Sequence, residues 1–256
     1  MPQHLLLLHG NGGTRTRFVP MLEQWPALYP EVELHIPELS GFAGRPLPAS
    51  GDYWSVFLQE IGKCVADVDS IDWVLYGHGI GGSLLMEWGA RGYPLPDGSR
   101  LKPRKVILHS IIGASLHKRF FPKLMRPMWI RSLMQSLITA RWMQPRWEKR
   151  LFRFPDQIPS DLKRQFFADY AECEAFPVFF DMLTVPWYRS VRERHDGADW
   201  HLLWGDLERI VAAKYLDLWR ADFPAATIES VPDWDHFPML DQPMEFVQKI
   251  GNLISR

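Results

Sequence analysis

The sequence has few cysteines, almost no net charge and no long apolar run at its N-terminus. Its 256 residues include two cysteines, Cys64 and Cys173, which neither form a disulfide framework nor fit the spacing of a metal site. Lysine and arginine total 29, and aspartate and glutamate total 30. The resulting net charge of −1 argues against a nucleic-acid partner. The apolar run HLLLLHG (4–10) is too short for a membrane span and lacks the features of a signal peptide, so we expect a cytoplasmic protein.

Short apolar runs alternate along the chain with longer amphipathic segments. Apolar runs bounded by turn residues predict strands at 4–10, 31–39, 72–77, 104–111, 199–206 and 226–233. Helix-like spacing of apolar residues predicts helices at 16–29, 52–68, 81–92, 212–223 and 243–254. Strands that alternate with helices in this way are typical of an α/β fold with a mostly parallel sheet. A chain of this length is sufficient for one large domain.

The alternation stops between residues 115 and 194. This region has helical patterns interrupted by prolines, and its first half is rich in arginine and lysine. We interpret residues 115–194 as a helical cap inserted into a core made of residues 1–114 and 195–256. The basic residues are explained most simply by a solvated helix face. Two more specific interpretations of these basic residues are that they attract anionic substrates or that they contact an anionic membrane surface. Apolar cap residues predicted to line a pocket are Phe120, Phe121, Trp129 and Trp142.

Five motifs follow one another in a characteristic order. They are LLLLHGNGG (5–13), IPELSGFAGRP (36–46), GHGIGGS (77–83), LLWGDLERIV (202–211) and DWDHFPMLDQPMEFVQKI (233–250). In this order they resemble the α/β-hydrolase superfamily. The resemblance implies the α/β-hydrolase fold, with a mostly parallel sheet of six to seven strands, flanking helices and an inserted helical cap.

The third motif resembles a nucleophile elbow that has lost its nucleophile. In the family, this strand-to-helix turn carries a serine at its tip, whereas the tip here is Gly79. The resemblance assigns the oxyanion hole to the backbone N–H groups of Asn11 and Ile80. It also places four further residues near the pocket, namely Gly10, Gly12, His78 and Ser110. Neither Ser110 nor Ser83 occupies the tip of the turn, so neither is a good substitute for the missing nucleophile.

The last two motifs resemble the segments that carry the catalytic acid and the histidine. The register of the family motif places the acid at Glu208, with Asp206 as the alternative. The histidine is His236, which precedes the sequence Asp-Gln-Pro. The glycine that usually precedes this histidine is replaced by Asp235, a departure that should change the surroundings of the imidazole.

A glycine at the elbow excludes a covalent acyl-enzyme on that residue. The first hypothesis is an enzyme in which His236 and Glu208 activate water to attack an ester, thioester or lactone. The same pair could instead remove a substrate proton in a lyase or isomerase reaction. A second hypothesis is a pseudoenzyme that binds a ligand or protein partner, and a third is a serine esterase inactivated by a Ser→Gly substitution. The predicted substrate is a small to medium apolar carbonyl compound, with no metal and no organic cofactor.

Overall fold

A computed structural model describes residues 3–49, 51–68 and 72–255, and this part of the chain contains one six-stranded sheet. The strand order is β2-β1-β3-β4-β5-β6, and every neighbouring pair is parallel. The strands are β1 (Gln3–Leu8), β2 (Val32–His35), β3 (Trp73–His78), β4 (Lys105–His109), β5 (Trp200–Gly205) and β6 (Thr227–Val231). The predicted parallel sheet of six to seven strands is therefore confirmed.

The central strands are buried on both faces. All six residues of β3 are buried, and so are five of the six in β1. This burial explains why their sequences are continuous apolar runs, because parallel strands covered by helices on both sides have no solvent-facing side chains. The edge strand β6 has no buried residue and mixes polar with apolar side chains.

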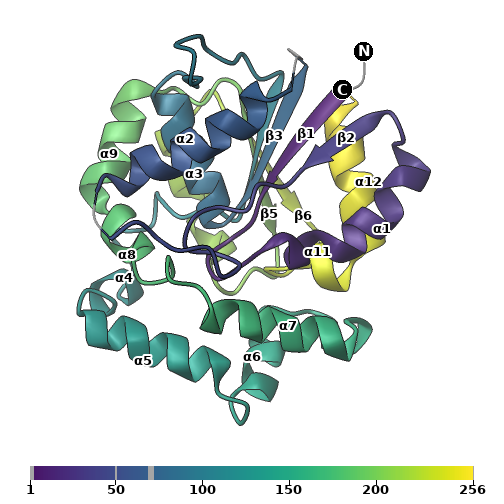
Figure 1. Ribbon diagram of the computed structural model, residues 1–256, viewed down its shortest axis with the longest axis vertical. Coiled ribbons are helices and arrows are strands. Elements are labelled where there is room, and N and C mark those ends of the chain that lie inside the picture. The colour runs from purple at the N-terminus through teal and green to yellow at the C-terminus, as the bar shows by residue number, and fades with distance from the viewer. Residues whose placement is uncertain (1–2, 50, 69–71, 256) are drawn as a thin grey trace.

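Helices cover both faces of the sheet (Figure 1). One face packs against α1 (Val19–Leu28), α11 (Pro238–Asp241) and α12 (Pro243–Ile254). The other face packs against α2 (Tyr53–Ala66), α3 (Ile80–Ala90), α9 (Val185–Arg194) and α10 (Leu216–Asp222). Two 3₁₀ turns, Arg15–Phe18 and Ala213–Tyr215, precede α1 and α10. The core therefore consists of two apolar layers separated by the sheet.

The segment between β4 and β5 is helical, and part of it projects from one end of the sheet (Figure 1). It contains α4 (Phe121–Leu124), α5 (Met128–Thr139), α6 (Gln144–Leu151), the 3₁₀ turn Pro155–Gln157, α7 (Ser160–Ala171), α8 (Phe179–Met182) and α9. Helices α5, α6 and α7 lie below the sheet in the figure. Helix α7 adds the buried Phe166 and Phe167 to one apolar layer and contacts the 3₁₀ turn Arg15–Phe18, whereas α9 packs on α3. The division into core and cap stays a prediction. Within the described ranges, no helix combines the length and apolar content that a membrane span requires.

Helix α3 lies unusually close to strand β3, because glycines occupy the contact. A Cβ atom on Gly77 would lie 2.4 Å from the backbone nitrogen of Gly82. A Cβ atom on Gly81 would lie 2.6 Å from the carbonyl oxygens of Leu8 and His9. These neighbours are backbone atoms, which cannot rotate away as a side chain can. Gly77 and Gly81 are therefore required by packing.

We predict that Gly77→Ala lowers the free energy of unfolding by about 2 kcal/mol, because the added methyl group overlaps the backbone of α3. The matched control is Gly62→Ala in α2, where a Cβ atom would be 3.4 Å from its nearest neighbour, the carbonyl oxygen of Pro94. Alanine favours a helix interior, so this control should be neutral or slightly stabilising. Urea denaturation of both variants tests the prediction. An equal loss of stability in the two variants would contradict it.

Candidate active site

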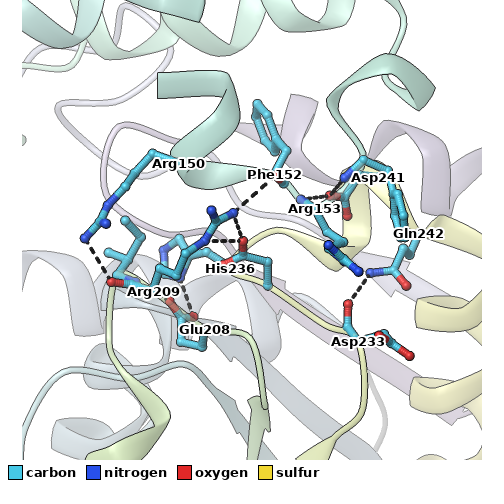
Figure 2. Close-up of polar contacts among 12 residues, drawn as sticks. Arg150, Phe152, Arg153, Glu208, Arg209, Asp233, His236, Asp241 and Gln242 are labelled. Atoms are coloured by element: carbon cyan, nitrogen blue, oxygen red, sulfur yellow. Dashed lines mark hydrogen bonds and ion pairs between the residues drawn. The ribbon is translucent and has the colours of Figure 1, made fainter. Parts of the chain in front are cut away.

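His236 and Glu208 form a buried pair at the ends of two strands. His236 lies in the loop between β6 and α11, and Glu208 lies in the loop that follows β5. The Nδ1 atom of His236 is 2.7 Å from Oε2 of Glu208. Figure 2 draws both side chains. Asp206, the alternative acid, is exposed, and its carboxylate accepts the backbone N–H of Asp233 instead. The structure thus brings together the two residues that the motif register selected.

The pair holds Glu208 in its ionised form. Burial by itself would raise the pKa of Glu208, but the adjacent His236 and several hydrogen bonds outweigh it and lower the pKa to about 2. The second carboxylate oxygen, Oε1, accepts the backbone N–H groups of Ile210 at 2.6 Å and Val211 at 3.0 Å. The carboxylate is therefore oriented from both sides, and it stabilises positive charge on the imidazole.

Asp235 supports this arrangement from the position where the family usually has glycine. Its carboxylate is buried, forms an ion pair with Arg209 and accepts the backbone N–H of His236 at 2.9 Å. The residue before the histidine therefore fixes the histidine's own backbone. This is the physical consequence of replacing the usual glycine.

Gly79 occupies the tip of the turn between β3 and α3. Its φ of 55° and ψ of −117° lie in a region that is strained for residues with a side chain. A Cβ atom there would meet one neighbour within 4 Å, the Cα atom of Gly10 at 3.6 Å. The space above Gly79 is thus large enough for a side chain. Ile80 begins α3, so its N–H has no intrahelical acceptor and lies at the positive end of the helix dipole.

The loop after β1 is held by a buried ion pair with α7. Arg17 lies 3.3 Å from the carboxylate of Asp169, and both side chains are almost fully buried. The same guanidinium donates to the carbonyl oxygens of Gly12 at 2.8 Å and Phe166 at 3.1 Å. The loop that carries Asn11 is therefore connected directly to the helical segment. Sequence reasoning missed Arg17 and Asp169, because nothing in their local sequence indicates a contact across 152 residues.

A cavity of about 440 Å³ lies over these elements. Its lining includes residues predicted from the motifs, namely Gly10, Asn11, His78, Gly79, Ile80 and His236. Most of the remaining wall is apolar and comes from α4, α5, α6, α7, α8 and the adjoining loops. Among its largest side chains are Phe121, Trp147, Phe176, Phe179 and Phe180. Only Phe121 among these was predicted, since helical spacing does not identify which face of a cap helix points inward.

Several pocket predictions need correction. Phe120, Trp129 and Trp142 are exposed to 74%, 67% and 67%, and they lie outside the cavity lining. Gly12 also lies outside it, because the ring of Tyr170 occupies the space where a Cβ atom would be. Ser110, which directly follows β4, is fully buried and is not part of the cavity lining.

His78 lines the cavity as an uncharged ring. It is fully buried, with its ring centroid 4.7 Å from that of His236 and 5.1 Å from that of His109. Burial and the nearby imidazoles lower the pKa of His78 well below its usual value, and burial lowers the pKa of His109 to about 3. His109 in turn lies 2.7 Å from the hydroxyl of Tyr76. His236 therefore faces neutral neighbours on this side.

Residues 5–249 match the profile of the alpha/beta hydrolase family. The chain belongs to this family. An esterase from Exiguobacterium antarcticum has the same fold, with 13% identity and a TM-score of 0.72 over 99% of this chain and 92% of that one. A bromoperoxidase from Bacillus anthracis is 14% identical, with a TM-score of 0.73 over 100% and 93% of the two chains. No curated protein sequence matches. Family membership supports a hydrolase-type activity, while identities this low show the fold alone.

Possible metal ligands in this alpha/beta hydrolase lie away from the cavity. Nitrogen atoms of His4 and His35 are 3.0 Å apart, and the carboxylate of Glu33 lies within 3.8 Å of both. The sequence did not indicate this cluster, because its residues come together only when β1 pairs with β2. Two imidazoles and a carboxylate suit Zn²⁺ and similar ions. His4 lies near the start of β1, whereas the cavity is beyond its other end, about 16 Å away at the usual rise per residue.

We predict that Glu208→Gln lowers stability at pH 7 by about 2 kcal/mol, and that this loss shrinks in acid. The folded-state pKa of Glu208 is about 2, below the ordinary value of 4.5. The contribution of its carboxylate is thus fully present above pH 4.5 and is lost as the pH falls toward 2. Urea denaturation at pH 7, 5 and 3.5 measures the difference between the two proteins.

Asp206→Asn is the matched control, because Asp206 is exposed and two residues away. This variant should show no comparable change with pH. A stability difference between wild type and Glu208→Gln that stays constant from pH 7 to 3.5 would disprove the assigned ionisation of Glu208.

Proposed function

We propose that this protein hydrolyses apolar carbonyl compounds, namely esters, thioesters or lactones, with water in place of a serine nucleophile. The observation that carries the proposal is the intact His236–Glu208 pair beside an open space above Gly79. Both His236 and Gly79 line the same cavity, whose apolar wall suits the rest of the substrate. This geometry and the family to which the chain belongs support catalytic roles for these residues.

The reaction proceeds by general-base catalysis. His236 accepts a proton from a water molecule above Gly79 while the water oxygen attacks the carbonyl carbon. Glu208 stabilises the imidazolium through its hydrogen bond to Nδ1. The negative charge that develops on the carbonyl oxygen is stabilised by the N–H groups of Ile80 and Asn11. His236 then returns the proton to the leaving oxygen or sulfur as its bond to carbon breaks, giving an acid and an alcohol or thiol.

A serine esterase that lost its nucleophile is the second candidate, and one observation favours it. The backbone of Gly79 has the positive φ of an elbow residue, and the space beside it would accept a Cβ atom without a clash. The two candidates differ in what a serine at this position should do. In the first, the added hydroxyl displaces the reacting water; in the second, it restores the missing group.

We predict that His236→Ala reduces hydrolysis of 4-nitrophenyl hexanoate by roughly 10²- to 10⁴-fold, because the general base is lost. The release of 4-nitrophenolate measures the rate. His117→Ala is the matched control, since His117 is exposed and lies outside the cavity lining. Turnover that survives His236→Ala at the wild-type rate would eliminate the proposed mechanism.

We predict that Gly79→Ser folds and lowers the water-dependent activity, at a strain cost of about 1 kcal/mol for the positive φ. Hydrolysis of the same ester and labelling by a serine-reactive fluorophosphonate are measured on the variant and the wild type. A large gain in hydrolysis together with labelling would identify the protein as a serine esterase without its serine, and would refute the water mechanism.

A further inference from the structure

Three arginines line the cavity, and they gather around the loop that carries Glu208. They are Arg119, Arg150 and Arg209. Arg119 donates to the carbonyl oxygen of Ile210, and Arg150 donates to that of Arg209 at 3.3 Å. Figure 2 shows Arg150 and Arg209 on the same side of the site as His236. The guanidinium groups of Arg119 and Arg150 are thus anchored to residues that follow Glu208 directly in the chain.

The charges of these arginines are unequally compensated. Arg209 forms an ion pair with the buried carboxylate of Asp235. For Arg119 and Arg150, no carboxylate of residues 3–49, 51–68 or 72–255 lies within ion-pair distance. The described residues that line the cavity include no aspartate or glutamate. The cavity therefore carries an excess of positive charge on one side.

Placing the Arg119 guanidinium in partly buried surroundings without an ion-pair partner costs free energy. An anionic ligand that pairs with it would offset this cost. Arg119 is partly buried, and burial lowers its pKa from the usual value, which reports how unfavourable its surroundings are to the charged form. Arginine does not lose its proton in proteins, so the cost is relieved by an anion and not by deprotonation. A guanidinium presents parallel N–H groups that match the two oxygens of a carboxylate or phosphate.

We propose that Arg119 and Arg150 bind a carboxylate or phosphate group of the ligand. The remaining wall of the cavity is apolar, so the ligand is an amphiphile with an apolar chain or ring and one anionic group. The assignment of this ligand as the substrate rests on the proposed function. In that case the anionic group lies close to the reacting carbonyl, because both arginines contact the loop that also positions Glu208 beside His236. Neutral esters such as 4-nitrophenyl hexanoate are then hydrolysed more slowly than esters of the same size that carry the anionic group.

Binding of non-hydrolysable probes to the full chain tests the proposal separately from turnover. Octanoate and octanamide have the same apolar chain and similar size but differ in charge. Octyl phosphate carries a phosphate in place of the carboxylate. Isothermal titration calorimetry at pH 7.5 should show octanoate binding roughly 10-fold tighter than octanamide. A preference for octyl phosphate over octanoate would identify phosphate as the group recognised. Equal affinity for octanamide and both anions would overturn the proposal.

The double variant Arg119→Gln/Arg150→Gln should lose that preference, with affinity for octanamide unchanged. Arg141→Gln/Arg146→Gln is the matched control, because both arginines are exposed on the same helical segment and lie outside the cavity lining. If this control weakens octanoate binding equally, the effect comes from overall charge and the site is refuted. Should the double variant not fold, Arg150→Gln alone supplies the test, since its side chain is exposed.

The outcome for the anion site is separable from that for hydrolysis. His236→Ala removes the proposed base and leaves both arginines in place, so octanoate should bind this variant as it binds the wild type. Retained binding without any esterase activity in the wild type would leave the anion site established and the proposed hydrolysis refuted.

Discussion

The close contact between helix α3 and strand β3 is the constraint on which the site depends. A Cβ atom at Gly77 would overlap the backbone of α3, and one at Gly81 would overlap the backbone of Leu8 and His9, so glycines allow α3 to begin directly after the turn around Gly79. This turn brings the first N–H of α3 to the end of the parallel sheet, where an unpaired backbone donor can act on a ligand. The same close packing presents position 79 to the cavity with open space above it.

Two buried polar connections place the helical segment over this end of the sheet. The Arg17–Asp169 pair joins the loop after β1 to α7. Backbone carbonyls accept from Arg17, and two threonine hydroxyls and the amide of Gln165 donate to Asp169. On the other side, the carboxylate of Asp241 accepts the N–H groups of Arg153 at 2.6 Å and Phe154 at 3.0 Å (Figure 2). Removing either Arg17 or Asp169 would leave the other charge buried without its partner. The two connections therefore favour one position of the helical segment over this end of the sheet.

The charged groups around the cavity lie in two places, one beside His236 and one beside Arg119 and Arg150. The ionised Glu208 supports His236, while the neutral His78 avoids adding a second positive charge beside it. Asp235 neutralises Arg209 and orients the histidine loop, which leaves Arg119 and Arg150 as the cations available to a ligand. One short loop, residues 208–211, thus carries Glu208, which contacts His236, and accepts hydrogen bonds from Arg119 and Arg150.

The sequence by itself determined the sheet, the elbow and the choice of Glu208 over Asp206 as the partner of His236. These features depend on local apolar runs, on glycine spacing and on motif register, all of which can be read over a few neighbouring residues. Only the tertiary structure decided which residues of the helical segment between β4 and β5 face the cavity. Trp129 and Phe176 are both aromatic residues of the helical segment, but the first is exposed and the second lines the wall. The contacts of Arg17 with Asp169 and of His4 with His35 were also decided only by the tertiary structure. Strand pairing and helix packing bring these residues together, and their local sequences do not predict it.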